Sequence, residues 1–140
     1  MILIVGGIAS GKRTFARSLG FADAQMADAT LDERPVVFNA QDLVSRDMTP
    51  EGMRTLADAL ADKSCVISCD VGSGVVPVDA GMRRERELAG RLAIELAARA
   101  RLVIRMVCGI PVPLKGRLED LRVGVAVPRS GGAAGAEGAL

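Results

Sequence analysis

Apolar runs alternate with polar and glycine-rich segments along the chain, and the runs have the pattern of buried strands. Four of them are apolar almost throughout and contain many β-branched residues, as expected for strands covered on both faces of a sheet. They occupy residues 2–5, 35–39, 64–70 and 101–109. A further run at 123–127 predicts a fifth strand.

Helical spacing of apolar residues fills the intervals between these strands. A short helix is predicted over residues 12–19. A second begins at Thr49 and Pro50, because threonine caps free amides and proline suits the first helical position. A third starts near Asp79 and carries one stripe of leucines at Leu88, Leu92 and Leu96. The alternation predicts an α/β fold, with a parallel sheet flanked by helices in three layers.

The periodic pattern fades in two places. Residues 20–35 are small and acidic, so we expect irregular structure or at most a short helix there. Residues 128–140 are mostly glycine and alanine, which predicts a disordered tail with almost nothing to bury. The remaining residues, 1–127, are predicted to form a single domain.

Composition argues against several classes of function. The net charge is only +1 and the chain lacks Trp and Tyr, so we expect no nucleic-acid partner. It also lacks histidine, and Cys65, Cys69 and Cys108 are not spaced as zinc ligands, so we expect three small buried residues. No segment approaches the ~18 apolar residues of a membrane span. Without a signal-peptide pattern, we expect a cytoplasmic protein.

A glycine-rich loop follows the first strand and precedes the first helix. Its sequence GGIASGK matches the phosphate-loop pattern G-x-x-x-x-G-K, in which backbone amides cradle phosphates and the lysine reaches the outer ones. This context makes the predicted fold P-loop NTPase-like and predicts binding of a purine nucleoside triphosphate, ATP or GTP. A glycine-rich turn without a ligand is the alternative. The predicted nucleotide-binding residues are Gly6, Gly7, Ile8, Ala9, Ser10, Gly11, Lys12, Arg13 and Thr14.

Arg13 occupies the position at which a phosphate loop normally has Ser or Thr. That hydroxyl binds magnesium, and a guanidinium cannot replace it because it has no acceptor lone pair and carries a like charge. Thr14 offers a hydroxyl one residue later, but a helix turns about 100° per residue, so Thr14 is a weak candidate for a metal ligand. Arg13 can instead neutralise phosphate charge directly.

Asp70 lies at the carboxyl end of the third predicted strand, the end at which open α/β sheets hold ligands. It is a candidate catalytic residue together with Lys12 and Arg13, and a weak candidate for a magnesium ligand. An aspartate that forms a turn is an equally good interpretation, and the same caution applies to Asp42 after the second strand.

Four segments follow one another along the chain in a characteristic order: MILIVGGIASGKRTFA, CDVGSGVVP, RRERELAGRLAIELAARA and VIRMVCGIPVPLKG. Over residues 1–20 and 64–116 the chain thereby resembles the bifunctional adenosylcobinamide kinase/adenosylcobinamide-phosphate guanylyltransferase family of cobalamin biosynthesis. The resemblance implies a parallel P-loop domain that assembles as a trimer. It implies phosphorylation of the aminopropanol hydroxyl of adenosylcobinamide by ATP or GTP, followed by GMP transfer through a guanylylated histidine.

The chain departs from the family pattern where the chemistry resides. It has no histidine, and the segment that bears it in the family is reduced to residues 20–35, so we expect the guanylyltransferase activity to be lost. Asn39 stands where the family's second strand ends in Asp, and Cys69 and Asp70 stand where it has Asn and Glu. An amide holds magnesium less strongly than a carboxylate, so we expect weakened Mg²⁺ binding.

Three hypotheses about function follow. The first is an adenosylcobinamide kinase-like protein that binds a nucleotide and transfers, at most, a phosphoryl group to a corrinoid. The second is a degenerate module that holds a nucleotide or a corrinoid, or pairs with an active homologue, without chemistry of its own. The third is an unrelated small P-loop kinase.

Overall fold

The computed structural model describes residues 1–72 and 76–121. Within these ranges a six-stranded sheet has the order β2-β3-β4-β1-β5-β6. The strands are β1 (Ile2–Gly6), β2 (Met26–Asp28), β3 (Val36–Phe38), β4 (Cys65–Cys69), β5 (Leu102–Val107) and β6 (Ile110–Lys115). The helices are α1 (Lys12–Ser18), α2 (Pro50–Ala61) and α3 (Ala80–Arg99), with 3₁₀ turns η1 (Asp23–Gln25), η2 (Ala40–Leu43) and η3 (Leu118–Asp120).

Strand β1 lies at the centre of the sheet, parallel to β4 on one side and to β5 on the other. Its first residue, Ile2, is level with the first residue of each neighbour, and its last residue, Gly6, is level with Cys69 and Met106. The carboxyl ends of these strands therefore reach the same edge of the sheet. The segments that follow β1 and β4 consequently start side by side.

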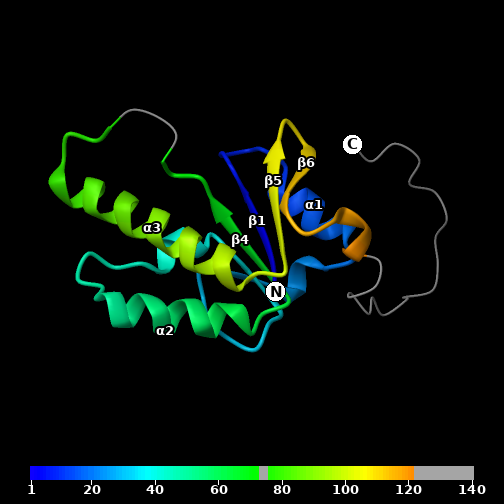
Figure 1. Ribbon diagram of the computed structural model, residues 1–140, viewed down its shortest axis with the longest axis horizontal. Coiled ribbons are helices and arrows are strands. Elements are labelled where there is room, and N and C mark those ends of the chain that lie inside the picture. Colours follow the sequence, from blue (N-terminus) through cyan, green and yellow to red (C-terminus); the bar gives the residue numbers. More distant parts are fainter. Residues whose placement is uncertain (73–75, 122–140) are drawn as a thin grey trace.

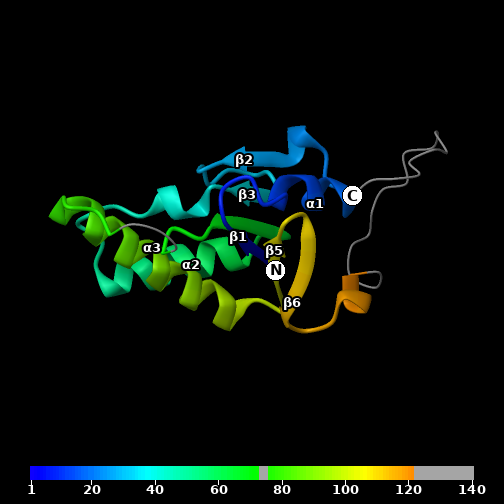
Figure 2. The same ribbon diagram turned by 90° about the horizontal axis from the view of Figure 1, so that it is seen from above.

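Helices cover both faces of the sheet, which gives the three layers that the sequence predicts. Helices α2 and α3 lie together on one face and α1 lies on the other (Figure 1, and Figure 2 from above). Alternate residues of each central strand point to opposite layers, so Leu3 packs with α2 and α3 whereas Ile4 packs with α1. The leucine stripe of α3 is buried as predicted, and each such leucine contributes roughly 1.5–3 kcal/mol.

The two longer helices begin where the sequence predicts. Thr49 caps α2, its hydroxyl accepting a hydrogen bond from the amide of Gly52 at 3.0 Å. Asp79 caps α3, its carboxylate accepting from the amides of Gly81 at 2.6 Å and Met82 at 3.1 Å. These amides favour the ionised carboxylate, so the pKa of Asp79 lies below its usual value.

Two strands were not predicted. The segment 20–35 contains β2, which pairs in parallel with β3. The sequence does not reveal β2 because a run of three residues is too short to show a period of two. Strand β6 pairs antiparallel with β5, so the sheet is mostly and not wholly parallel. Pro111 and Pro113 obscured β6 in the sequence, but prolines are tolerated on an edge strand, whose outer side needs no donors.

The prediction of three buried cysteines is right for Cys65 alone. Cys69 is half-buried and Cys108 is exposed in the β5–β6 turn. Burial raises the pKa of the Cys65 thiol to about 12, so this side chain behaves as a small apolar residue.

The predicted strand at 123–127 and the tail at 128–140 lie outside the described residues. Over the described part of the chain, no helix combines the length and the apolar character that a membrane crossing requires.

Candidate nucleotide site

The loop between β1 and α1 curls back over the end of the central strand. The amide of Ser10 donates to the carbonyl of Gly7 at 3.3 Å, and the amide of Phe15 donates to Gly11 at 2.9 Å. Ala9 and Gly11 both have positive φ angles, of 56° and 92°. A backbone that turns in this way directs successive amides to one side, as anion-binding loops do.

Glycine is required at two positions of this loop. A Cβ at Gly6 would lie 2.5 Å from Ser10 Oγ and 2.8 Å from the carbonyl oxygen of Met106, closer than real Cβ atoms approach. A Cβ at Gly11 would lie 3.2 Å from the Cα of Gly109, and the φ of Gly11 is one that side chains rarely adopt. The glycines of the motif therefore serve the shape of the loop.

The turn between β5 and β6 contacts the glycine-rich loop and supports it. The amide of Gly109 donates to the carbonyl oxygen of Ser10 at 3.1 Å. This contact joins residues nearly one hundred positions apart, and the motif gives no indication of it. The antiparallel hairpin at the sheet edge thus holds the glycine-rich loop in place.

Two cationic side chains lie along the loop. The ammonium of Lys12 donates to the carbonyl oxygen of Gly7 and so folds across the loop. The guanidinium of Arg13 lies over the ring of Phe38, 4.1 Å from its centroid. This contact with the last residue of β3 is worth roughly 0.5–1 kcal/mol at an exposed site and fixes the direction of the charge.

A cavity of about 500 Å³ opens beside the loop. Seven of the nine predicted nucleotide-binding residues line it, from Ile8 to Thr14, whereas Gly6 and Gly7 are not on its wall. Thr14 was expected to face elsewhere, but it lines the cavity with its neighbours. The rest of the wall comes from the carboxyl ends of β3 and β4: Phe38, Asn39, Gln41, Ile67, Cys69 and Val71.

Asp70 lies next to this cavity and lines a neighbouring one. Its carboxylate accepts from the amide of Gly72 at 3.2 Å and lies 3.6 Å from the guanidinium of Arg105 on β5. The aspartate therefore does form a turn, the interpretation that the sequence left open. Asp42, in η2, lines the same neighbouring cavity.

The side chains that line the cavity beside the glycine-rich loop are poor ligands for a magnesium ion. Arg13 offers no acceptor, and Asn39 offers one neutral amide oxygen and no carboxylate, its nitrogen donating to Asp28 at 2.8 Å. Within residues 1–72 and 76–121, no three His, Cys, Asp or Glu side chains come together as a metal site. Carboxylate oxygens are the ligands that magnesium prefers, and here they do not converge.

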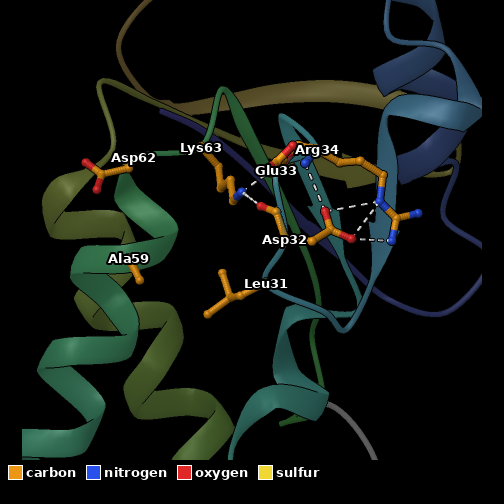
Figure 3. A pocket seen from close by; sticks show the side chains of 7 residues that line it. All are labelled: Leu31, Asp32, Glu33, Arg34, Ala59, Asp62 and Lys63. Carbon is orange, nitrogen blue, oxygen red and sulfur yellow. Dashed lines mark hydrogen bonds and ion pairs between the residues drawn. The ribbon is translucent and has the colours of Figure 1, made fainter.

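A third hollow, of about 820 Å³, lies at the opposite end of the sheet, where β3 and β4 begin (Figure 3). Its charged groups bind one another. Arg34 donates to the carboxylate of Asp32, and the ammonium of Lys63 donates to the carbonyl oxygens of Asp32 and Arg34 (Figure 3). The side-chain bond from Arg34 is the main reason that the pKa of Asp32 is lowered to about 2. The bonds of Lys63 tie the segment before β3 to the segment before β4.

Sequence reasoning missed three contributors to the site. Gln41 accepts from the amide of Cys69 at 2.9 Å and lines both cavities at the carboxyl edge. Phe38 supports Arg13, and Gly109 supports the loop. A position just after a predicted parallel strand is a signal that could have found Gln41. Nothing local marks the other two, because each acts through a contact distant in sequence.

A strand, a glycine-rich loop and a helix at the centre of a mostly parallel sheet covered on both faces define an α/β protein of the P-loop NTPase-like class. A family model described as cobinamide kinase / cobinamide phosphate guanyltransferase matches residues 36–114, from the first residue of β3 almost to the end of β6. The match takes in more than half of the chain, and the chain belongs to this family. No curated protein matches it as a relative.

Membership confirms the resemblance and places the chain among the nucleotide-using transferases of cobalamin biosynthesis. The matched range includes η2, β4, Asp70 and α3, which border the two adjoining cavities, and it begins after residues 8–14, which border them as well. The trimer that the resemblance implies stays a prediction.

Proposed function

We propose that this chain binds ATP or GTP at residues 6–14 and transfers the terminal phosphoryl group to the aminopropanol hydroxyl of a cobinamide. One observation carries the proposal: a cavity of about 500 Å³ at the carboxyl ends of β3 and β4, walled by a curled glycine loop and two cations. Open α/β sheets hold ligands at this end of their strands. The family match supplies the acceptor.

Each charged residue has a stated part in the reaction. Lys12 exchanges its bond to Gly7 for the outer phosphates, and Arg13 adds a second positive charge at the cavity wall. The acceptor oxygen bonds to the terminal phosphorus, the bond from that phosphorus to the bridging oxygen breaks, and the hydroxyl proton passes to Asp70. Phosphoryl transfer depends mainly on positioning and on charge neutralisation, and these groups provide both. We expect the turnover to be slow.

The guanylyltransferase half of the family's activity is absent from this proposal. A covalent guanylyl intermediate on histidine needs a histidine, and the sequence contains none. We therefore expect the reaction to stop at the phosphorylated corrinoid. The same proposal includes a cytoplasmic location, which the sequence pattern supports, and a trimer, which the family resemblance supports.

The test is a direct assay for the product. Purified protein is incubated with cobinamide and ATP or GTP, with and without Mg²⁺, and the corrinoid is examined by chromatography and mass spectrometry. A mass increase of one phosphoryl group that requires Lys12 supports the proposal. A mass increase of one GMP would show that the second half-reaction persists by another route.

A binding module without chemistry is the second candidate. The poor fit of the site to magnesium favours it, because Arg13 replaces the usual hydroxyl and Asn39 supplies a neutral amide in place of a carboxylate. Saturable nucleotide binding without any phosphorylated corrinoid, over hours and at high protein concentration, would decide for the module.

A further inference from the structure

A second cavity, of about 380 Å³, adjoins the nucleotide cavity at the same edge of the sheet. It lies between η2, the end of β4 and the amino-terminal half of α3. The two cavities share four wall residues: Ile8, Gln41, Cys69 and Val71. A group bound in one therefore lies next to a group bound in the other.

The walls of this second cavity combine apolar and acidic side chains. Ile8, at the tip of the phosphate loop, is 90% exposed, and Met82, on α3, is 52% exposed. Large apolar side chains this exposed beside a cavity favour a ligand that covers them. Three carboxylates, of Asp42, Asp70 and Glu85, line the same space with one guanidinium, that of Arg86.

Two of these carboxylates are held by arginines outside the cavity wall. Arg105 lies 3.6 Å from Asp70, and Arg46 donates to Glu85 at 2.7 Å. A carboxylate can accept several hydrogen bonds, so both retain capacity toward a ligand that donates. Together with Arg86, these two arginines offset the three carboxylates, so the cavity and its immediate surroundings carry no net charge. The cavity therefore suits a neutral ligand.

Gln41 marks the boundary between the two cavities. The amide of Cys69 can only donate, so the hydrogen bond at 2.9 Å assigns the side-chain oxygen of Gln41 to it. The nitrogen of the same side chain is then the group that can donate to a ligand at the boundary.

We propose, on the basis of the function proposed above, that this second cavity receives the phosphoryl acceptor. The acceptor is an alcohol with an apolar surface and with hydrogen-bond donors such as primary amides, and it carries no net negative charge. One arm of a large acceptor enters the cavity, so that its hydroxyl reaches the shared wall beside Asp70 while its body rests on Ile8 and Met82. The nucleotide and the acceptor then occupy separate cavities that meet at Gln41.

The test places a negative charge on the apolar part of this wall. Met82→Glu is compared with Ile94→Glu, which makes the same kind of change at a 70% exposed residue of the same helix that does not line the cavity. Both side chains are exposed, so both variants should fold, and their melting temperatures are recorded. The dissociation constants of cobinamide and of ATP or GTP are measured for each.

Met82→Glu should raise the dissociation constant of cobinamide at least tenfold and leave that of the nucleotide within twofold, whereas Ile94→Glu should change neither. If cobinamide binds wild type and Met82→Glu equally well, the cavity is not the acceptor site, although the proposed kinase function stands. If Met82→Glu weakens the nucleotide instead, the cavity holds part of the nucleotide and the inference is wrong. If wild type binds no cobinamide, the proposed function fails and this inference fails with it.

Discussion

The two ends of the sheet contrast in what their charged residues do. At the amino ends of β3 and β4, the larger hollow is lined by charges that satisfy one another, Asp32 with Arg34, and Lys63 with two carbonyl oxygens. At the carboxyl edge, the cavity is smaller, but its wall is a curled backbone with Lys12 and Arg13. The larger hollow is therefore not the one whose lining suits a phosphate.

The two ends differ in the partners that their charged side chains bind. In the far hollow the ion pair fixes the loop before β3, and the bonds of Lys63 join that loop to the segment before β4. Occupying the hollow with a ligand would therefore disrupt these contacts. At the carboxyl edge, the hydrogen bond that the ammonium of Lys12 makes among the described residues lies within its own loop, and a phosphate can take the place of the carbonyl of Gly7 without separating two strands. This comparison predicts that charge removal at one end impairs binding and at the other impairs stability.

The largest expected effect is on nucleotide affinity. Lys12→Ala should weaken ATP and GTP binding by roughly 10- to 100-fold, because a charge-assisted hydrogen bond contributes about 1.5–3 kcal/mol. Lys63→Ala is the matched control at the other end of the sheet, and it should leave nucleotide affinity unchanged while lowering the melting temperature. Titration calorimetry measures the first and thermal melts the second. Equal affinity losses in both variants would remove the contrast between the ends.

Restoring the hydroxyl of the motif should change catalysis. Arg13→Ser should raise magnesium-dependent turnover by roughly tenfold or more, because a metal ion contributes several kcal/mol of charge stabilisation in a transition state. The initial rate of corrinoid phosphorylation with and without Mg²⁺ is the measurement. A fall in turnover would instead show that the cation of Arg13 itself has taken over the work of the metal.

The loop glycine should matter more than a helical glycine. Gly11→Ala forces an alanine into the left-handed region at a cost of about 1–2 kcal/mol and should weaken nucleotide binding. Gly90→Ala, in the exposed middle of α3 with no atom within 4 Å of the new Cβ, should raise stability by about 0.5–1 kcal/mol. Denaturant unfolding measures both stabilities. A loop that tolerates alanine without loss of affinity would contradict the proposed geometry.

The smallest effect concerns pH at the far end. The pKa of Asp32 is depressed to about 2 from an ordinary value of 3.8, so its contribution to stability is present above pH 4 and is lost as the pH falls through 2. Asp32→Asn should therefore melt below wild type at pH 7, and the difference should shrink between pH 4 and pH 2. A difference that does not vary with pH would mean that Arg34 does not stabilise the charged form.

Much of the fold could be predicted from local pattern. The four apolar runs became β1, β3, β4 and β5, and the caps at Thr49 and Asp79 start the two longer helices, because periodicity and capping depend on neighbouring residues only. Strands β2 and β6 could not be predicted in this way. One is too short to show a period, and the other contains two prolines that only an edge position makes acceptable.

The candidate site likewise contains residues that a local motif predicts and contacts that it does not predict. Gly6, Gly11, Lys12 and Arg13 follow from a motif within nine residues, whose chemistry is local. Asp70 lies at the carboxyl edge of the sheet, as predicted, but its partner Arg105 on β5 was not predicted, because only the register with β1 brings that strand to the same edge.

The amino-acid sequence by itself determined the strand–loop–helix at the start of the chain and the absence of a histidine for guanylyl transfer, since both are properties of residue type and spacing. Only the tertiary structure decided that the β5–β6 turn supports the glycine-rich loop, that Arg13 lies over Phe38, and that a second cavity meets the first at Gln41. Those features join segments far apart in the chain. They arise when the parallel register brings strand ends to a common edge, which no short stretch of sequence encodes.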